Sequence, residues 1–229
     1  MYKKIIIALI LIFSFLPSKA ELLDTSQPLY LFTFGVRAGF NTSNRTFPAG
    51  HFNMWNNNGW GTGGDVGILA NINLREFISI QPGIFFDTRS GSFSYLTAYI
   101  NYFDNEDVHY EMGRLRGYNV TVPVMVVMKF NIASKLKFTG EVGPYYQLSL
   151  KQTGQNNVSI LYREPQSNDY LSYRAKLKKY DVGLKIGFGT LLYDNYYIGV
   201  HYLAGFMDAW KLPAGGRNKE WLFTLGYDF

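Results

Sequence analysis

The feature that most constrains this chain is an alternation of apolar and polar residues with a period of two. In residues 32–40, phenylalanine, valine and alanine at the even positions alternate with threonine, glycine and arginine at the odd positions. Successive side chains of a β-strand point to opposite faces of a sheet, so this segment is predicted to be a strand with one apolar and one polar face. From residue 21 onward, no apolar run reaches the roughly 18 residues that a transmembrane helix needs.

The same alternation recurs along the chain and predicts eight strands. They are expected at residues 30–40, 63–73, 77–88, 118–130, 136–149, 179–192, 196–207 and 219–229. Short and long connections alternate without exception between these segments, and the short ones are residues 74–76, 131–135 and 193–195. An up-and-down barrel with both termini in the periplasm has this order, because its periplasmic turns are short and its extracellular loops are long.

The chemistry of the two faces indicates which of them meets lipid. Charged residues make up only 17% of the chain and aromatic residues another 17%, whereas soluble domains carry about 25% charged residues. A soluble lipocalin-type barrel is the alternative, but it would turn the apolar face inward and would not explain the alternating connections. We therefore predict an all-β fold, an eight-stranded antiparallel up-and-down transmembrane β-barrel over residues 21–229.

Residues 1–20 are predicted to be a secretory signal peptide. Lys3 and Lys4 precede an apolar run over residues 5–16, and small residues at Ser18 and Ala20 fit cleavage after Ala20. An uncleaved anchor is the alternative, but this run is shorter than the roughly 20 residues needed to cross a bilayer. The sequence contains no cysteine, which excludes lipoprotein attachment, a disulfide scaffold and a thiolate metal site.

The basic residues do not indicate a nucleic-acid partner. The full chain has a formal net charge of +5, and removal of residues 1–20 takes away lysines but no acidic residue. The remaining basic clusters, Arg114 with Arg116 and Lys176 with Lys178 and Lys179, are short. A nucleic-acid-binding protein would need a concentrated basic face.

Several short motifs resemble, in their order along the chain, a family of known barrels. They are FGVRAGFN at 34–41, ISIQPGIFF at 78–86, VPV at 122–124, GPY at 143–145, DVGLKIG at 181–187 and LGYDF at 225–229. Together they resemble the PorT-like outer-membrane β-barrel family of Bacteroidetes over nearly all of the chain after residue 20. The family commonly has acidic residues where this chain has Gly83 and Thr121, so the resemblance does not extend to carboxylates at those positions. It implies an outer-membrane barrel with a role in protein secretion, assembly or uptake.

Charged residues on the polar face are candidates for an ionic network inside the barrel. They are Arg37, Asp65, Asp87, Arg89, Lys129, Lys137, Glu141, Asp181, Lys185 and Glu220. The interior of an eight-stranded barrel is just filled by its own side chains, and a buried charge without a partner is very costly. We therefore expect these residues to pair and to fill the lumen, so that it does not form a channel.

Aromatic residues in the predicted loops are candidates for a binding surface. The set comprises Trp55, Trp60, Tyr99, Tyr102, Tyr162, Tyr170 and Trp210. Tyrosine and tryptophan are favoured at protein interfaces, but they also pack loops together and mark the outer lipid interface. The expected partners are membrane lipid and, through these loops, other envelope proteins.

Two motifs that could bind ligands lack the context they need. Residues 59–64 have the G-x-G-x-x-G spacing, but a nucleotide site requires a strand before it and a helix after it. Residues 104–111 contain several acidic residues and could bind calcium, but the glycine turn of a calcium loop is missing and a solvated loop is the expected alternative. No nucleotide, cofactor or metal is therefore predicted.

The three histidines, His51, His109 and His201, are not accompanied by a recognisable nucleophile motif. His201 falls on the polar face of a predicted strand, where a structural role is expected. We predict no catalytic residues and a non-enzymatic scaffold or binding subunit of the cell envelope. The alternatives are a small adhesin, or a loop-based hydrolase or acyltransferase that acts on lipid or peptide through His51 or His109.

Overall fold

The computed structural model describes residues 22–46, 58–98, 108–153, 159–163, 170–174, 178–209 and 217–229. The barrel strands are β1 (Phe32–Thr46), β2 (Asn58–Arg75), β3 (Ile78–Ala98), β4 (Val108–Ala133), β5 (Leu136–Thr153), β8 (Tyr180–Leu192), β9 (Tyr196–Gly205) and β10 (Arg217–Asp228). Two further strands, β6 (Ser159–Arg163) and β7 (Tyr170–Arg174), lie between β5 and β8 in the sequence and form a separate two-stranded sheet. Among these residues no helix is long and apolar enough to span a bilayer. The predicted signal peptide lies outside the described residues.

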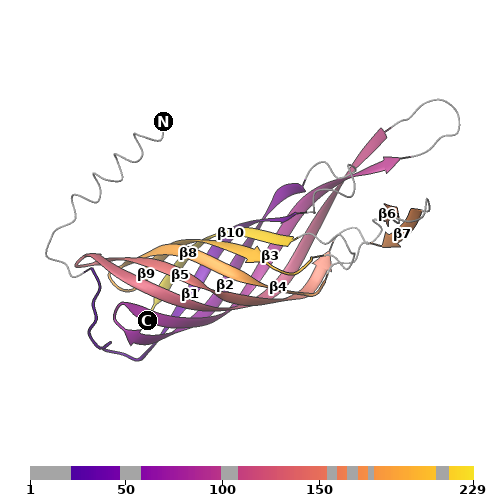
Figure 1. Ribbon diagram of the computed structural model, residues 1–229. Coiled ribbons are helices and arrows are strands. Elements are labelled where there is room, and N and C mark those ends of the chain that lie inside the picture. Colours follow the sequence, from indigo (N-terminus) through magenta and orange to yellow (C-terminus); the bar gives the residue numbers. More distant parts are fainter. Residues whose placement is uncertain are drawn as a thin grey trace, which may run out of the picture.

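Eight strands form a closed antiparallel barrel in the order β1-β10-β9-β8-β5-β4-β3-β2 (Figure 1). The first and last strands complete the closure, with pairs that run from Gly35 opposite Asp228 to Thr46 opposite Arg217. Every strand of the wall therefore has a hydrogen-bonded neighbour on both sides. The prediction of an all-β, eight-stranded antiparallel barrel is confirmed.

The two faces of the barrel wall are inverted relative to those of a soluble protein. Apolar side chains on the outer face are exposed, and Phe34, Phe188 and Leu225 each show more than 60% of their surface. Polar side chains on the inner face, such as Asn41 and Glu220, are almost completely buried. An outer surface of this kind is suited to hydrocarbon, and the predicted assignment of the apolar face to the outside is correct.

Three short turns connect the strands at one end of the barrel, which we call the turn end, and the other end is called the loop end. The turns follow Arg75, Ala133 and Leu192. In the last of them, Tyr193 and Asp194 have positive φ angles of 54° and 62°, as in the two central residues of a type I′ hairpin turn. This turn geometry allows β8 and β9 to continue directly as a hairpin.

Aromatic rings on the outer face lie toward both ends of the wall. At the turn end, the ring of Tyr227 is 5.3 Å from that of Tyr196 and 5.2 Å from that of Phe229, measured between centroids. Toward the loop end, the rings of Tyr202 and Trp221 are 4.8 Å apart. Aromatic girdles at the two lipid interfaces are characteristic of membrane-spanning barrels.

At the loop end, four strands extend beyond the limits that were predicted from the sequence. β1 continues to Thr46, β2 begins at Asn58, β3 continues to Ala98 and β4 begins at Val108, whereas the predicted limits were residues 40, 63, 88 and 118. β6 and β7 were missed and taken as loop. The apolar alternation marks only the part of a strand that faces lipid, but backbone pairing continues beyond it because the ladder needs no apolar side chains.

We expect arginine on the outer face to destabilise the barrel in a way that depends on depth. Ile186→Arg, in the middle of β8, should lower the free energy of unfolding from lipid vesicles by about 2–4 kcal/mol. Leu150→Arg, near the loop end of β5, is the matched control and should cost about 0–1 kcal/mol, since arginine there reaches the interface. Urea titration followed by tryptophan fluorescence measures both values. Equal effects would contradict a membrane-spanning wall.

Candidate functional site

Arg89 organises the centre of the lumen. Its Nε lies 2.5 Å from Glu220 Oε2 on β10 and 3.3 Å from Asp87 Oδ1 on β3, and its Nη1 donates a hydrogen bond of 2.9 Å to Gln147 Oε1 on β5. The contact with Glu220 is an ion pair without the alignment of a hydrogen bond. Because β3, β5 and β10 are not neighbours in the wall, this cation connects separate parts of the barrel across its interior.

Asp87 is held by side chains from the next two strands. Its carboxylate accepts hydrogen bonds from Asn119 Nδ2 at 2.8 Å, from Gln147 Nε2 at 3.2 Å and from the Thr121 hydroxyl. These donors, together with Arg89, stabilise a carboxylate that is only 3% exposed. The two charges were predicted from the sequence, whereas the two amide side chains were not. Their positions on the inward-facing side of β4 and β5 could have predicted that they lie in the lumen.

A second cluster surrounds Glu141. Its Oε1 accepts hydrogen bonds from Tyr197 Oη at 2.6 Å and Thr139 Oγ1 at 3.0 Å, and its Oε2 lies 2.9 Å from His201 Nε2. The other ring nitrogen of His201 is 3.5 Å from Thr224 Oγ1 on β10. His201 is 3% exposed and stacks on Tyr197. The cluster therefore connects β5, β9 and β10 through buried polar contacts.

Arg37 connects the first strand to the last. Its Nη1 lies 2.6 Å from Asp228 Oδ1 and also donates to the carbonyl of Val36 at 3.1 Å. The guanidinium carbon is 4.3 Å from the centroid of the Tyr197 ring, a cation–π contact. Asp228 was not in the predicted network, although its position on the inner face of the last strand was available from the alternation.

The turn end of the lumen opens into a cavity of about 250 Å³. Lys137 Nζ lies 2.7 Å from Asp194 Oδ1 and 4.0 Å from Glu76 Oε2 at its wall. Lys129 Nζ donates a hydrogen bond of 3.2 Å to Asn73 Oδ1. These two lysines therefore lie at the mouth of the barrel, not within its central ionic cluster.

Asp65 and Lys185 are buried without an ion pair among the described residues. Asp65 lies directly opposite Asp87 in the β2–β3 pairing, and neither of its carboxylate oxygens accepts a hydrogen bond from the described residues. Lys185 Nζ is 5.1 Å from the centroid of the Phe85 ring. Buried water is the ordinary partner of such groups.

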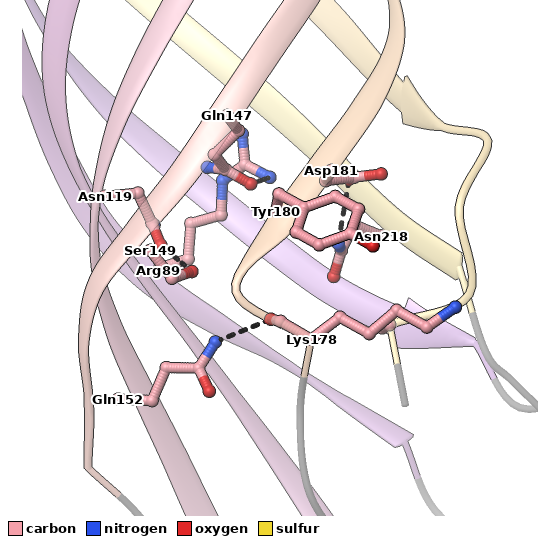
Figure 2. A pocket seen from close by; sticks show the side chains of 10 residues that line it. Arg89, Asn119, Gln147, Ser149, Gln152, Lys178, Tyr180, Asp181 and Asn218 are labelled. Carbon is pink, nitrogen blue, oxygen red and sulfur yellow. Dashed lines mark hydrogen bonds between the residues drawn. The ribbon is translucent and has the colours of Figure 1, made fainter. Parts of the chain in front are cut away.

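Side chains from several strands line a small cavity at the loop end of the lumen (Figure 2). Its volume is about 10 Å³, which is space for roughly one water molecule. Asp181 Oδ2 accepts hydrogen bonds from Asn218 Nδ2 at 2.8 Å and from the Tyr145 hydroxyl at 3.2 Å. At the same cavity, Gln152 Nε2 donates a hydrogen bond of 3.0 Å to the carbonyl of Lys178.

Within the predicted set of charged residues, the structure pairs Arg89 with Asp87 and with Glu220. The other ion pairs use partners from outside that set, namely Asp228, Asp194, Glu76 and His201. Across the middle of the barrel, the inner face is occupied by buried side chains of the described strands. The described lumen is thus a filled interior, with open volume at the turn end.

Most of the predicted aromatic surface lies outside the part of the chain that the structure describes. These residues are Trp55, Tyr99, Tyr102 and Trp210, and His51 and residues 104–107 also lie outside it. Trp60 lies on β2 and is 48% exposed. Tyr162 and Tyr170 belong to β6 and β7, where Tyr162 is opposite Leu171 and Tyr170 is opposite Arg163, and His109 lies in β4 opposite Thr97. The G-x-G-x-x-G segment lies within strand β2, which continues after it to Arg75 in place of the helix that a nucleotide site requires.

The family model of the outer membrane protein beta-barrel domain matches residues 25–210. The chain belongs to this family. Membership agrees with the inverted faces and closed wall, and it indicates that the protein is an outer-membrane barrel in contact with lipid. No curated protein is a significant match to the sequence.

Solved barrels from several bacteria have similar structures at low sequence identity. Ail of Yersinia pestis, solved in complex with the heparin analogue sucrose octasulfate, is 14% identical, with a TM-score of 0.41 over 87% of this chain and 100% of that chain. OprG of Pseudomonas aeruginosa is 11% identical, with a TM-score of 0.47 over 90% and 99%. The Escherichia coli outer membrane protease OmpT is 8% identical, with a TM-score of 0.40 over 86% and 95%.

Removal of the central cation should destabilise the barrel strongly. Arg89→Met leaves Asp87 and Glu220 buried without their cation, so the free energy of unfolding should fall by about 3–5 kcal/mol. Lys219→Met, which removes an exposed cation, is the control and should change it by less than about 0.5 kcal/mol. Urea titration in vesicles measures both variants. Recovery of part of the loss by adding Glu220→Gln to Arg89→Met would show that the buried carboxylate is the cause.

We expect the purified barrel to show no stable conductance in planar lipid bilayers, because buried side chains occupy the middle of an eight-stranded lumen. Gly187→Leu serves as the comparison, since a side chain there would collide with the His201 ring and force it to shift within the lumen; heat-modifiable migration on gels verifies that this variant is folded. Reproducible wild-type channels that Gly187→Leu removes would show that ions pass through the lumen, contrary to this prediction.

Proposed function

We propose that this barrel is a non-enzymatic scaffold of the cell envelope that binds other proteins at its loop end. The observation that carries the proposal is the unequal length of the strands. Pairing of β3 with β4 continues to Ala98 opposite Val108, whereas pairing of β4 with β5 begins at Arg116 opposite Thr153. β3 and β4 therefore continue beyond the wall as a two-stranded ribbon, visible in Figure 1.

The ribbon offers the kind of edge on which protein strands pair. Pairing of β2 with β3 reaches only Asn58 opposite Phe93, so residues 94–98 of β3 and 108–115 of β4 have no further strand beside them in the described sheet. Unpaired backbone N–H and C=O groups are a template for a strand from another chain. A two-stranded ribbon is also only marginally stable alone, so a bound partner strand would stabilise it.

The lumen supports a scaffold better than a channel or an enzyme. Arg89, Glu220 and the surrounding amides occupy its centre, and His201 is held by Glu141 and Tyr197 in a buried position. Within the described part of the lumen, this imidazole is therefore shielded from solvent. With short turns in the periplasm, as in other outer-membrane barrels, the loop end and its ribbon face outward.

The resemblance to PorT-like barrels supports a more specific version of the proposal. In that version the protein is a subunit of a secretion, assembly or uptake complex, and the ribbon is one of its contacts with the other subunits. An adhesin would use the same surface toward a molecule outside the cell. A stable complex within the native membrane is the property that separates the two.

Shortening the ribbon should remove specific partners and leave the barrel intact. Since Ser94 is opposite Met112, residues 95–111 can be replaced by Asn-Gly, which favours a tight hairpin turn. Affinity purification from native membranes in mild detergent, followed by mass spectrometry, should lose the partners found with the wild type. Heat-modifiable migration on gels verifies that the shortened barrel is folded.

Deletion of the β6–β7 hairpin, residues 159–174, provides the comparison at the same end of the barrel. Partners that survive shortening of the ribbon but are lost with β6–β7 would contradict the role assigned to the ribbon. Recovery of the wild-type protein only as a monomer would contradict the complex-subunit proposal.

A further inference from the structure

The two short basic clusters of the sequence come together in the fold. Arg116 lies on β4 opposite Thr153 of β5, and the backbone N–H of Ser149 on β5 donates a hydrogen bond of 2.6 Å to the carbonyl of Lys179. Lys151 lies between them on β5. Lys179 immediately precedes β8, and β4, β5 and β8 are consecutive strands of the wall. Three cations that are far apart in the sequence therefore lie near one another at the loop end, and we call them the basic patch: Arg116, Lys151 and Lys179.

The members of the basic patch are exposed cations. None of them has a carboxylate within 4.0 Å among the described residues. Asp181 lies two residues after Lys179, but its carboxylate is buried and accepts hydrogen bonds from Asn218 and Tyr145. The patch therefore differs from the lumen, where Arg37 and Arg89 have carboxylate partners.

Lipid-facing side chains lie directly beside the basic patch on the same strands. On β5, Leu148 and Leu150 are 40% and 59% exposed, and on β8 Tyr180 is 48% exposed. Tyr180 lies opposite Leu148 and immediately follows Lys179. The cations are thus placed where the apolar wall ends, which is the level of lipid headgroups for a barrel in a membrane.

We propose that the basic patch binds the phosphate groups of a lipid in the leaflet at the loop end, with the acyl chains against Leu148, Leu150 and Tyr180. Arginine can bind a phosphate with two parallel hydrogen bonds, and lysine adds point charges with flexible stems. The outward orientation of the loop end makes the phosphorylated glycolipid of the outer leaflet the ligand. A soluble anion is disfavoured, because the exposed apolar strip below the cations fits acyl chains and gives no contact to a free phosphate.

The test uses the full barrel in phosphatidylcholine nanodiscs, with bisphosphorylated lipid A added as the probe and binding measured by native mass spectrometry. Lys151→Gln with Lys179→Gln should weaken binding by roughly 25-fold, the effect of removing two basic residues at a membrane surface. Arg75→Gln with Lys135→Gln is the matched control, since it removes two exposed cations from the turn end. It should leave binding unchanged.

Chemically dephosphorylated lipid A should bind the wild type as weakly as bisphosphorylated lipid A binds the Lys151→Gln, Lys179→Gln variant. Inorganic phosphate at millimolar concentration should not displace lipid A. Equal losses for the two double variants, equal binding of the dephosphorylated lipid, or displacement by free phosphate would each overturn the proposal. None of these readouts depends on a protein partner, so the outcome is independent of the scaffold function proposed above.

Discussion

The structure depends on the pairing of every backbone polar group in the part of the wall that faces lipid. Hydrocarbon offers no hydrogen-bond partners, so a sheet in a bilayer must close on itself. Here the closure is made by the long antiparallel pairing of β1 with β10, reinforced inside by the ion pair between Arg37 and Asp228. The exposed apolar side chains and the three short turns are consistent with this requirement.

Closure with eight strands leaves a narrow interior, and the inward side chains must fill it. Small residues make room for large ones: a side chain at Gly189 or Gly199 would collide with the ring of Tyr197. Charged groups in such a space need partners, and Arg89 provides one for two carboxylates at once. A filled, cross-linked lumen therefore stabilises the closed barrel.

The alternation of residues was sufficient to predict the number of barrel strands, their direction and the face that meets lipid, because each of these follows from local periodicity. The pairing of charges could not be predicted in the same way. Arg37 and Asp228 are separated by 191 positions in the sequence, and their contact depends on the register of the closing strands. The ends of β3 and β4 were also missed, since beyond the membrane the backbone ladder continues without an apolar signal.

Charged residues in the lumen differ from those at the loop end in whether they have a carboxylate partner. Inside the barrel, Arg89 has carboxylates within ion-pair distance and is shielded from solvent. Its interactions therefore stabilise the folded barrel. At the loop end, Lys151 and Lys179 are exposed and have no carboxylate within that distance among the described residues. Charges in the second state gain most from an external anion. The ribbon edges of β3 and β4 that have no further strand beside them in the described sheet lie at the same end, which is why both of our binding proposals concern the loop end.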